Sequence, residues 1–518
     1  MLAREELRRR THDRPRRSIF RRRRPSLGVV AGLSAFLLSA GQLLVWRPPI
    51  GLADNGDYGR LLCQLGQKAV LPAGVPAYFR WVNFRYQQSP QGHCLSYYST
   101  ELPVLRAAQW VSKHLFHFTG LDLQVVGLIH AAILAILVWL VVRVLPGPRW
   151  VRVVAAIVLL IGICDTSFVV YLSSAYSEPM SMMGVLALLA AGLHTWRYSV
   201  VSTVGLLCIF GAALLLILAK TQNAPLAVVV LLALVARRCP LGRWRGTITA
   251  RFLPVILGLI LVLVAANYSA SAPRTLRQNN KYDAVFFELL NNSSNPAQDA
   301  LALGLDPSLA RYAGTSAYSR PNASSDPAFA EFDHVVSYWK LAQFYAARPG
   351  RMLDLAARGA HASLSMRPKY LGSYAASSGY RGQACRLCLV SSAASALQPV
   401  APVLVPVLWL GSIVTAVALR RRRAGPGETR ALADALILLP TLAIGAFAAA
   451  LLGEGGYEMV KHMFLVAVTD VVLLPMVGVG VAILLGDRRR IPPVIPPLPR
   501  FGHSPISPMS SARGRAPH

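Results

Sequence analysis

The sequence predicts an all-α polytopic membrane protein with about ten transmembrane helices and two large extracytoplasmic loops. Of its 518 residues 54% are apolar, and its mean hydropathy of +0.45 exceeds that of soluble globular proteins. Apolar runs of about twenty residues, each long enough to cross the hydrocarbon as a helix, recur along the chain. The arginines stand in short clusters between these runs, so the formal charge of +30 indicates membrane orientation rather than nucleic-acid binding.

The first predicted span is Ser26–Trp46, which follows an arginine-dense stretch from Arg8 to Arg24. A cleaved signal peptide is the alternative. However, the apolar run is longer than the usual signal core, and no A-x-A cleavage site follows it. We therefore interpret this segment as an uncleaved anchor with its N-terminus in the cytoplasm.

Nine further apolar runs complete the predicted membrane region. If the first helix runs outward, alternation places every later arginine cluster on the cytoplasmic side, as the positive-inside rule requires, and an error in the count must be even. The closely spaced runs between 150 and 236 are the least clearly separated. The predicted spans are about 124–142, 150–168, 178–195, 200–219, 223–236, 252–268, 399–419, 431–452 and 462–485.

Two polar segments are too long to be simple connections, and we expect both to carry short helices on the outer face. The C-terminal tail is rich in proline and is predicted to be disordered. The predicted organisation is a basic cytoplasmic N-terminus (1–25), helices 1–7 (26–268) including a first loop (47–123), a large outer loop (269–398), helices 8–10 (399–486) and a cytoplasmic tail (487–518).

Four of the seven cysteines fall in the predicted outer loops. Cys63 and Cys94 share the first loop, and Cys385 and Cys388 share the second. Outside thiols meet oxidising conditions, so two bridges are expected, with four free cysteines as the alternative. A Cys63–Cys94 bridge would close a loop worth roughly 3 to 4 kcal/mol in the chain-entropy model.

Polar residues gather at four helix ends that the topology places at the outer surface. The stretches are ADNGDYGR (53–60), YLSSAYSEPMS (171–181), AKTQNAP (219–225) and GEGGYEMVKHMF (453–464). Ionisable groups at membrane depth are costly, so they usually face a polar cavity and mark function. The candidate site residues are Asp54, Asp57, Arg60, Glu178, Lys220, Gln222, Glu458, Lys461 and His462.

Each stretch also has a structural interpretation. Asp57 could cap a helix that starts at Tyr58, and Glu178 could be an ordinary acidic first turn stabilised by the helix dipole. Lys220 could extend its amine to the membrane surface. Glu458 and His462, four residues apart, could form a helical salt bridge or a metal pair, although a third metal ligand is not evident.

The convergence of the four stretches favours a cleft open to the outside. Its cations, Lys220, Lys461 and Arg60, could hold a phosphate, while Asp54 or Asp57 accepts a proton from an attacking hydroxyl. Such a site suits transfer from a lipid phosphate at the bilayer surface.

The motifs NGDYGR, SAYSEP, KTQNAP and GYEMVKHMF, together with the topology, resemble the GT-C superfamily of membrane glycosyltransferases. More narrowly, they resemble the WsfD-like hexosyltransferases of bacterial surface-glycan synthesis. The resemblance covers roughly 40–235 and 430–485. It implies a polyprenyl-phosphate sugar donor, a glycan or lipid-linked acceptor outside the membrane and inversion at the anomeric carbon.

The resemblance also implies residue roles. The early acid of such enzymes acts as general base or binds a metal, and it corresponds here to Asp57, with Asp54 as the second candidate. Lys220, Lys461 and Arg60 would stabilise the leaving phosphate. The two acids depart from a plain DxD or DE pattern because they are three residues apart. A divalent cation therefore stays an open candidate cofactor.

Two other function classes remain open. A transporter or lipid flippase would also place acids and lysines in a membrane, but it predicts repeated halves and broken helices near the midplane. A polymerase or ligase of lipid-linked glycans shares the topology and the cationic outer loops. The sequence leaves the sugar, the acceptor and the linkage undetermined.

Overall fold

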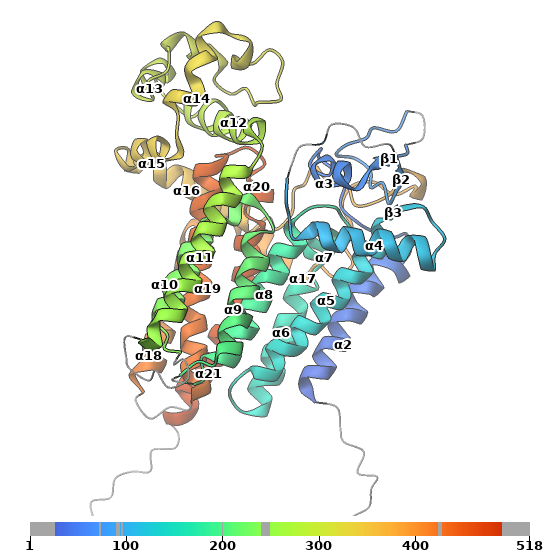
Figure 1. Ribbon diagram of the computed structural model, residues 1–518, viewed down its shortest axis with the longest axis vertical. Coiled ribbons are helices and arrows are strands. Elements are labelled where there is room, and N and C mark those ends of the chain that lie inside the picture. Colours follow the sequence, from blue (N-terminus) through green and yellow to red (C-terminus); the bar gives the residue numbers. More distant parts are fainter. Residues whose placement is uncertain are drawn as a thin grey trace, which may run out of the picture.

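The computed structural model describes residues 26–71, 74–89, 94, 97–198, 200–239, 249–422 and 427–488. The predicted basic N-terminus and proline-rich tail lie outside these residues, apart from residues 487 and 488 at the end of the final helix. The two polar loops of the sequence, 47–123 and 269–398, are called here the first and second soluble segments. Both lie at one end of a helix bundle (Figure 1). The first described helix begins, and the last one ends, at the opposite end of the bundle. The two predicted outer loops thus lie on the same side of the bundle.

A helix occupies every predicted span, yet the structure does not confirm ten membrane crossings. Six described helices are long and apolar enough to cross alone, or seven if the pair α6 and α7, bent by 64°, counts as one broken span. α9 and α10 have only 15 and 10 residues, short of the roughly 20 that a crossing needs. The bundle helices are α2 (Leu27–Ala40), α5 (Leu123–Val144), α6 (Arg149–Ile163), α7 (Thr166–Leu172), α8 (Glu178–Thr195), α9 (Thr203–Ile217), α10 (Leu226–Val235), α11 (Thr249–Ser271), α18 (Ala401–Arg421), α19 (Gly427–Gly453) and α21 (Phe464–Arg488).

Helix α8 forms the centre of the bundle. Nearly all its residues are buried, because α5, α9, α19 and α21 pack around it. It approaches α9 closely at Gly184, where a Cβ atom would lie 2.6 Å from the Leu216 Cα atom. A helix buried on all sides cannot shift without disturbing its neighbours. Its first residue, Glu178, is therefore held in a fixed place at the end of the bundle that carries the soluble segments.

The first soluble segment contains a small sheet that the sequence did not predict. Its three strands are antiparallel in the order β1-β2-β3, with Tyr86 opposite Ala69 and Leu121. Strands of three or four residues give too little alternation to be recognised from sequence. The elements are α3 (Gly59–Leu62), β1 (Gln67–Ala69), β2 (Arg85–Gln88), α4 (Glu101–Leu115) and β3 (Gly120–Asp122).

The second soluble segment is built from short helices around an aromatic core. Tyr282 packs on Phe286 with ring centroids 4.5 Å apart, and Phe329 stacks on Phe332 at 4.6 Å. Its elements are α12 (Arg274–Tyr282), the π-helix η4 (Asp283–Leu290), α13 (Pro296–Ala302), α14 (Phe332–Val335), α15 (Tyr338–Ala346), α16 (Pro349–Ser363) and α17 (Leu389–Leu397); α20 (Met459–His462) lies between α19 and α21.

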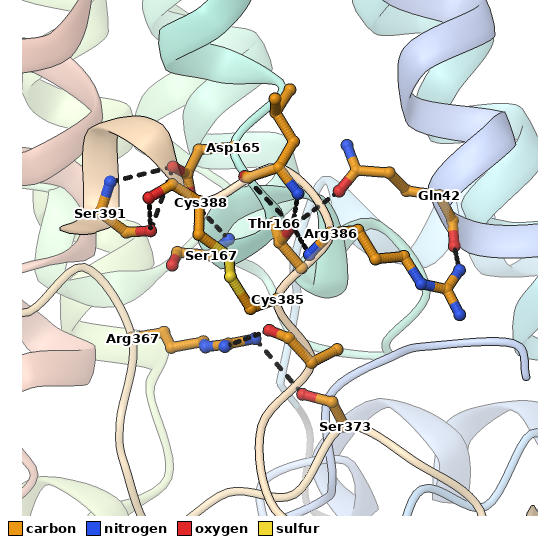
Figure 2. Close-up of a disulfide and its surroundings, with 12 residues drawn as sticks. Gln42, Asp165, Thr166, Ser167, Arg367, Ser373, Cys385, Arg386, Cys388 and Ser391 are labelled. Atoms are coloured by element: carbon orange, nitrogen blue, oxygen red, sulfur yellow. Dashed lines mark hydrogen bonds between the residues drawn. A yellow bond between two sulfur atoms is a disulfide. The ribbon is translucent and has the colours of Figure 1, made fainter. Parts of the chain in front are cut away.

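Both expected disulfides are present, Cys63–Cys94 and Cys385–Cys388. The second closes a loop that lies against the break between α6 and α7 (Figure 2). There the hydroxyl of Thr166 accepts hydrogen bonds from the backbone amides of Arg386 and Leu387, 3.0 and 2.8 Å away. The end of the large soluble segment is thereby fixed to the bundle.

The Cys63–Cys94 bridge fixes the segment that contains α3. Replacing both cysteines with serine is expected to destabilise the protein by about 3 to 4 kcal/mol, because the unfolded chain regains the entropy of an open loop. Thermal unfolding of the purified protein at one scan rate measures the change. Cys208→Ser, at an exposed free cysteine, is the control, and equal melting temperatures for all three proteins would contradict the expectation.

Candidate active site

Four chain segments meet at the end of the bundle where the soluble segments lie. They are the turn before α3, the first turn of α8, the short helix η3 (Thr221–Asn223) and α20. In Figure 1, α3 and α20 both lie at this end of the bundle. The structure thus brings all nine candidate residues of the sequence into one neighbourhood.

Asp54 organises the turn that presents Asp57. One carboxylate oxygen of Asp54 accepts hydrogen bonds from the backbone amides of Gly56 at 2.7 Å and Tyr58 at 3.1 Å. Gly56 has a φ of +108°, a conformation that L-residues avoid. The interpretation of Asp57 as a helix cap is wrong, because α3 begins at Gly59, after Tyr58, and no side chain caps it. The Asp57 carboxylate pairs with cations instead.

Asp57 lies between two cations. Its Oδ1 is 2.8 Å from a terminal nitrogen of Arg60, and its Oδ2 forms an ion pair with Nζ of Lys461. The Lys461 side chain is 1% exposed, so its charge requires buried counter-charges. Nζ of Lys461 also lies 3.6 Å from Oε2 of Glu458 and 4.6 Å from the centre of the Tyr176 ring, a cation–π arrangement.

This arrangement keeps Asp57 ionised. Burial would raise the pKa of the carboxyl, but the charges of Lys461 and Arg60 outweigh burial and hold its pKa well below the usual range. Reciprocally, Asp57 and Glu458 raise the pKa of Lys461 despite its burial. Asp54 behaves differently, since burial raises its pKa to about 6.

Glu458 connects Lys461 to both soluble segments. Its carboxylate oxygens accept hydrogen bonds from the Asn55 amide at 2.8 and 2.7 Å and from the Tyr370 hydroxyl at 2.9 Å. Glu458 has a φ of +46°, which is uncommon outside glycine. The predicted helical salt bridge between Glu458 and His462 is wrong, because Glu458 precedes α20 and its carboxylate meets Lys461 instead.

A second group of polar contacts, around Lys220 and His462, lies beside the group formed by Asp57, Lys461 and Glu458. Lys220 places Nζ 3.0 Å from Oε1 of Glu178 and 3.3 Å from Nδ1 of His462, and Nε2 of His462 meets the Glu454 carboxylate. Gln222 donates to the His462 carbonyl at 2.9 Å. The Lys220 side chain is only 14% exposed, so the interpretation that it extends to the membrane surface is wrong.

These two groups of polar side chains border one small pocket. Its lining includes Asp57, Arg60, Tyr176, Glu178 and Lys220. Its volume of about 20 Å³ leaves room for roughly one water molecule. A sugar therefore fits inside this pocket only if the side chains that line it move.

The carboxylates of the site do not converge as metal ligands would. Asp54 turns one oxygen to backbone amides, and both oxygens of Asp57 face cations. Within the described part of the chain, no three His, Cys, Asp or Glu side chains form a group that could hold a metal ion. These residues do not fit the divalent cation that the sequence left open.

Some residues of the site were not among the sequence candidates. Asn55 donates to Glu458, and the Tyr176 hydroxyl donates to the Ala53 carbonyl at 2.8 Å and lies 3.1 Å from Oδ1 of Asn55. Both stand within candidate motifs, but an uncharged side chain carries little signal by itself. Glu454 stands in the fourth polar stretch, and its contacts with His462 and with the Asn280 amide, which donates to it at 2.9 Å, distinguish it from a solvated acid.

Comparison with known proteins gives one match. The family model described as the YfdI N-terminal transmembrane domain matches residues 16–488. No curated protein and no solved structure matches the chain.

Proposed function

The chain belongs to the YfdI N-terminal transmembrane domain family of multi-pass membrane proteins, and from this membership and the Asp57 cluster we propose that it is a membrane glycosyltransferase. Its substrates are a sugar carried on a polyprenyl phosphate and a glycan or lipid-linked acceptor on the predicted extracytoplasmic side. The resemblance of its motifs to WsfD-like enzymes supports a hexose as the sugar. The observation that carries the proposal is an ionised carboxylate with three neighbouring cations at the end of a membrane bundle.

Asp57 acts as the general base. The acceptor hydroxyl oxygen forms the new bond to the anomeric carbon, and its proton passes to the Asp57 carboxylate. The bond between the anomeric carbon and the lipid phosphate oxygen breaks, and the phosphate keeps the electron pair. Attack from the face opposite the departing phosphate inverts the anomeric centre.

The cations stabilise the negative charge of the leaving phosphate. Lys461, Arg60 and Lys220 hold charges next to the pocket, and positive groups fixed in place stabilise a leaving phosphate more than mobile water does. A phosphate that enters competes with Asp57 for Lys461 and Arg60. Loss of these partners raises the basicity of Asp57, so donor binding both opens the pocket and activates the base.

A transporter is the second candidate, and one observation favours it. The bend of 64° between α6 and α7 is the kind of broken helix that transporters use near a substrate site. The polar groups at this break are already satisfied, since the Asp165 carboxylate accepts hydrogen bonds from the backbone and hydroxyl of Ser391 at 2.9 and 3.1 Å. We therefore assign the bend to packing against the Cys385–Cys388 loop.

A transfer assay tests the proposed function. Purified protein in detergent, supplied with polyprenyl-phosphate hexoses and candidate glycan acceptors, is expected to release polyprenyl phosphate and to lengthen the acceptor by one hexose, as mass spectrometry would detect. Transfer is expected to persist in EDTA, because cations of the chain itself occupy the place of a metal. Addition of many sugars would indicate a polymerase, and transfer abolished by EDTA and restored by Mg²⁺ would contradict the metal-free site.

A further inference from the structure

A second, larger pocket lies in the second soluble segment. Its volume is about 340 Å³, within the range of pockets that bind small molecules. It is formed by η4, α15 and α16, and its lining includes Glu288, Asn292, Tyr345, Arg351, Asp354 and Arg358.

This pocket adjoins the loop that leads into α20. Glu288 lines the pocket and also packs against Gly455 and Gly456, where Cβ atoms would lie 2.5 Å from its Cβ and 2.3 Å from its Oε2. The next residues on that loop are Tyr457 and Glu458, the partner of Lys461. One loop therefore separates the pocket from the proposed catalytic cluster, and glycine is required where the loop touches Glu288.

Aromatic rings continue along the same loop. Tyr457 lies edge-on to Phe287 with ring centroids 5.3 Å apart, and it stacks on Tyr318 at 5.9 Å. Tyr318 is 56% exposed and lies within electrostatic reach of Arg60 and Asp57. Exposed aromatic faces combined with nearby polar groups offer the mixed surface that amphipathic ligands contact. A saccharide can therefore follow rings and polar groups from the pocket towards Asp57.

The free hydrogen-bonding groups of the pocket suit hydroxyls. Arg351 is engaged by Asp299 and the Leu289 carbonyl, and Arg358 by Glu288. In contrast, among the described residues none forms a hydrogen bond or ion pair with the exposed Asp354 side chain or a hydrogen bond with the Tyr345 hydroxyl. An unpaired carboxylate accepts hydrogen bonds from hydroxyl groups. The two acids of the lining, Glu288 and Asp354, balance its two arginines, so the pocket has no excess positive charge that would attract an anion.

We propose that this pocket binds a neutral saccharide portion of the acceptor, while the Lys461 cluster takes the donor phosphate. The identification of this saccharide as the acceptor rests on the proposed function, but the predicted binding of a saccharide does not depend on transfer. Asp354 and Tyr345 bind sugar hydroxyls, and Arg358, whose side chain is 41% exposed and which follows Asp354 by four residues on α16, donates to a neighbouring sugar oxygen.

Ligand-observed NMR with the full-length protein in detergent tests the binding. The probes are the methyl glycosides of glucose, galactose and mannose, with inorganic phosphate as the anionic probe. At least one glycoside is expected to bind the wild type, and Asp354→Asn and Tyr345→Phe are each expected to weaken it by about tenfold through loss of one hydrogen bond. Glu331→Gln removes an exposed acid that does not line the pocket and should bind as the wild type does.

Three results would overturn the inference: no glycoside binds, binding is equal in Asp354→Asn and the Glu331→Gln control, or phosphate binds in a manner that depends on Asp354. Thermal unfolding of each variant confirms that it folds. Asp57→Asn is expected to bind the glycoside normally, so a failure of the proposed transfer is distinguished from a failure of the pocket. If transfer is observed, Asp354→Asn should raise the acceptor KM by about tenfold and leave the donor KM unchanged.

Discussion

Replacing Asp57 with asparagine is expected to lower the rate of sugar transfer by about 10²- to 10⁴-fold, the usual contribution of a general base. Asparagine keeps the shape of the side chain but cannot take the proton of the acceptor hydroxyl. It also removes the charge that faces Lys461 and Arg60, so donor binding should persist. Initial rates with a labelled polyprenyl-phosphate hexose measure the loss of rate and the donor KM separately.

Asp122→Asn is the matched control for this variant. Asp122 lies in the same soluble segment and caps α5 by accepting from the Gln124 amide at 2.8 Å, which asparagine can also do. Its transfer rate should equal that of the wild type. Transfer by Asp57→Asn at the rate of this control would rule out Asp57 as the base.

Replacing Lys461 with methionine is expected to lower transfer by about 10²- to 10³-fold, because a buried cation that stabilises the leaving phosphate is lost. Asp57 and Glu458 also lose a counter-charge. Arg60 remains beside Asp57, and the Asp57 side chain is 22% exposed, so we expect a loss of stability of about 1–3 kcal/mol. Initial rates and thermal unfolding measure the two effects.

The pH dependence of this variant distinguishes catalysis from folding. Lys461 is a main reason why the pKa of Asp57 is held low, so its removal raises that pKa, and the base becomes protonated at a higher pH. The acidic limb of the rate profile should therefore move to higher pH relative to the wild type. Lys281→Met, which breaks the ion pair with Asp333 in the second soluble segment, should leave the profile unchanged, and an unmoved profile in Lys461→Met would contradict the assigned coupling.

The positions of the helices could be predicted because the apolar runs and arginine clusters follow directly from the cost of placing polar groups in lipid. The number of crossings could not, because the lengths of α9 and α10 depend on how neighbouring helices cover them. The sheet around Tyr86 was missed for a related reason. Its strands are short and are held by pairing between residues distant in sequence.

The site was predictable as a set of residues but not as a set of contacts. Charged residues at four helix ends indicated convergence. The sequence could not show that Asp54 serves its own turn, that Lys461 rather than His462 meets Glu458, or that Lys220 is paired with Glu178. Such pairings depend on side-chain directions at helix ends. The turn at Gly56 and the left-handed Glu458 set those directions here.

The central claim is that the protein transfers a sugar and does not transport its donor. It is tested most directly by measuring glycan labelling and donor movement across the bilayer in the same sample. Wild-type protein and Asp57→Asn are placed in proteoliposomes that contain a doubly labelled polyprenyl-phosphate hexose, with acceptor glycan on both sides. The label in the glycan and the movement of donor across the bilayer are followed together. We predict that the wild type transfers hexose to the glycan and that Asp57→Asn does not, with donor movement equal to that of empty vesicles for both. Donor movement above that of empty vesicles without glycan labelling would contradict the account.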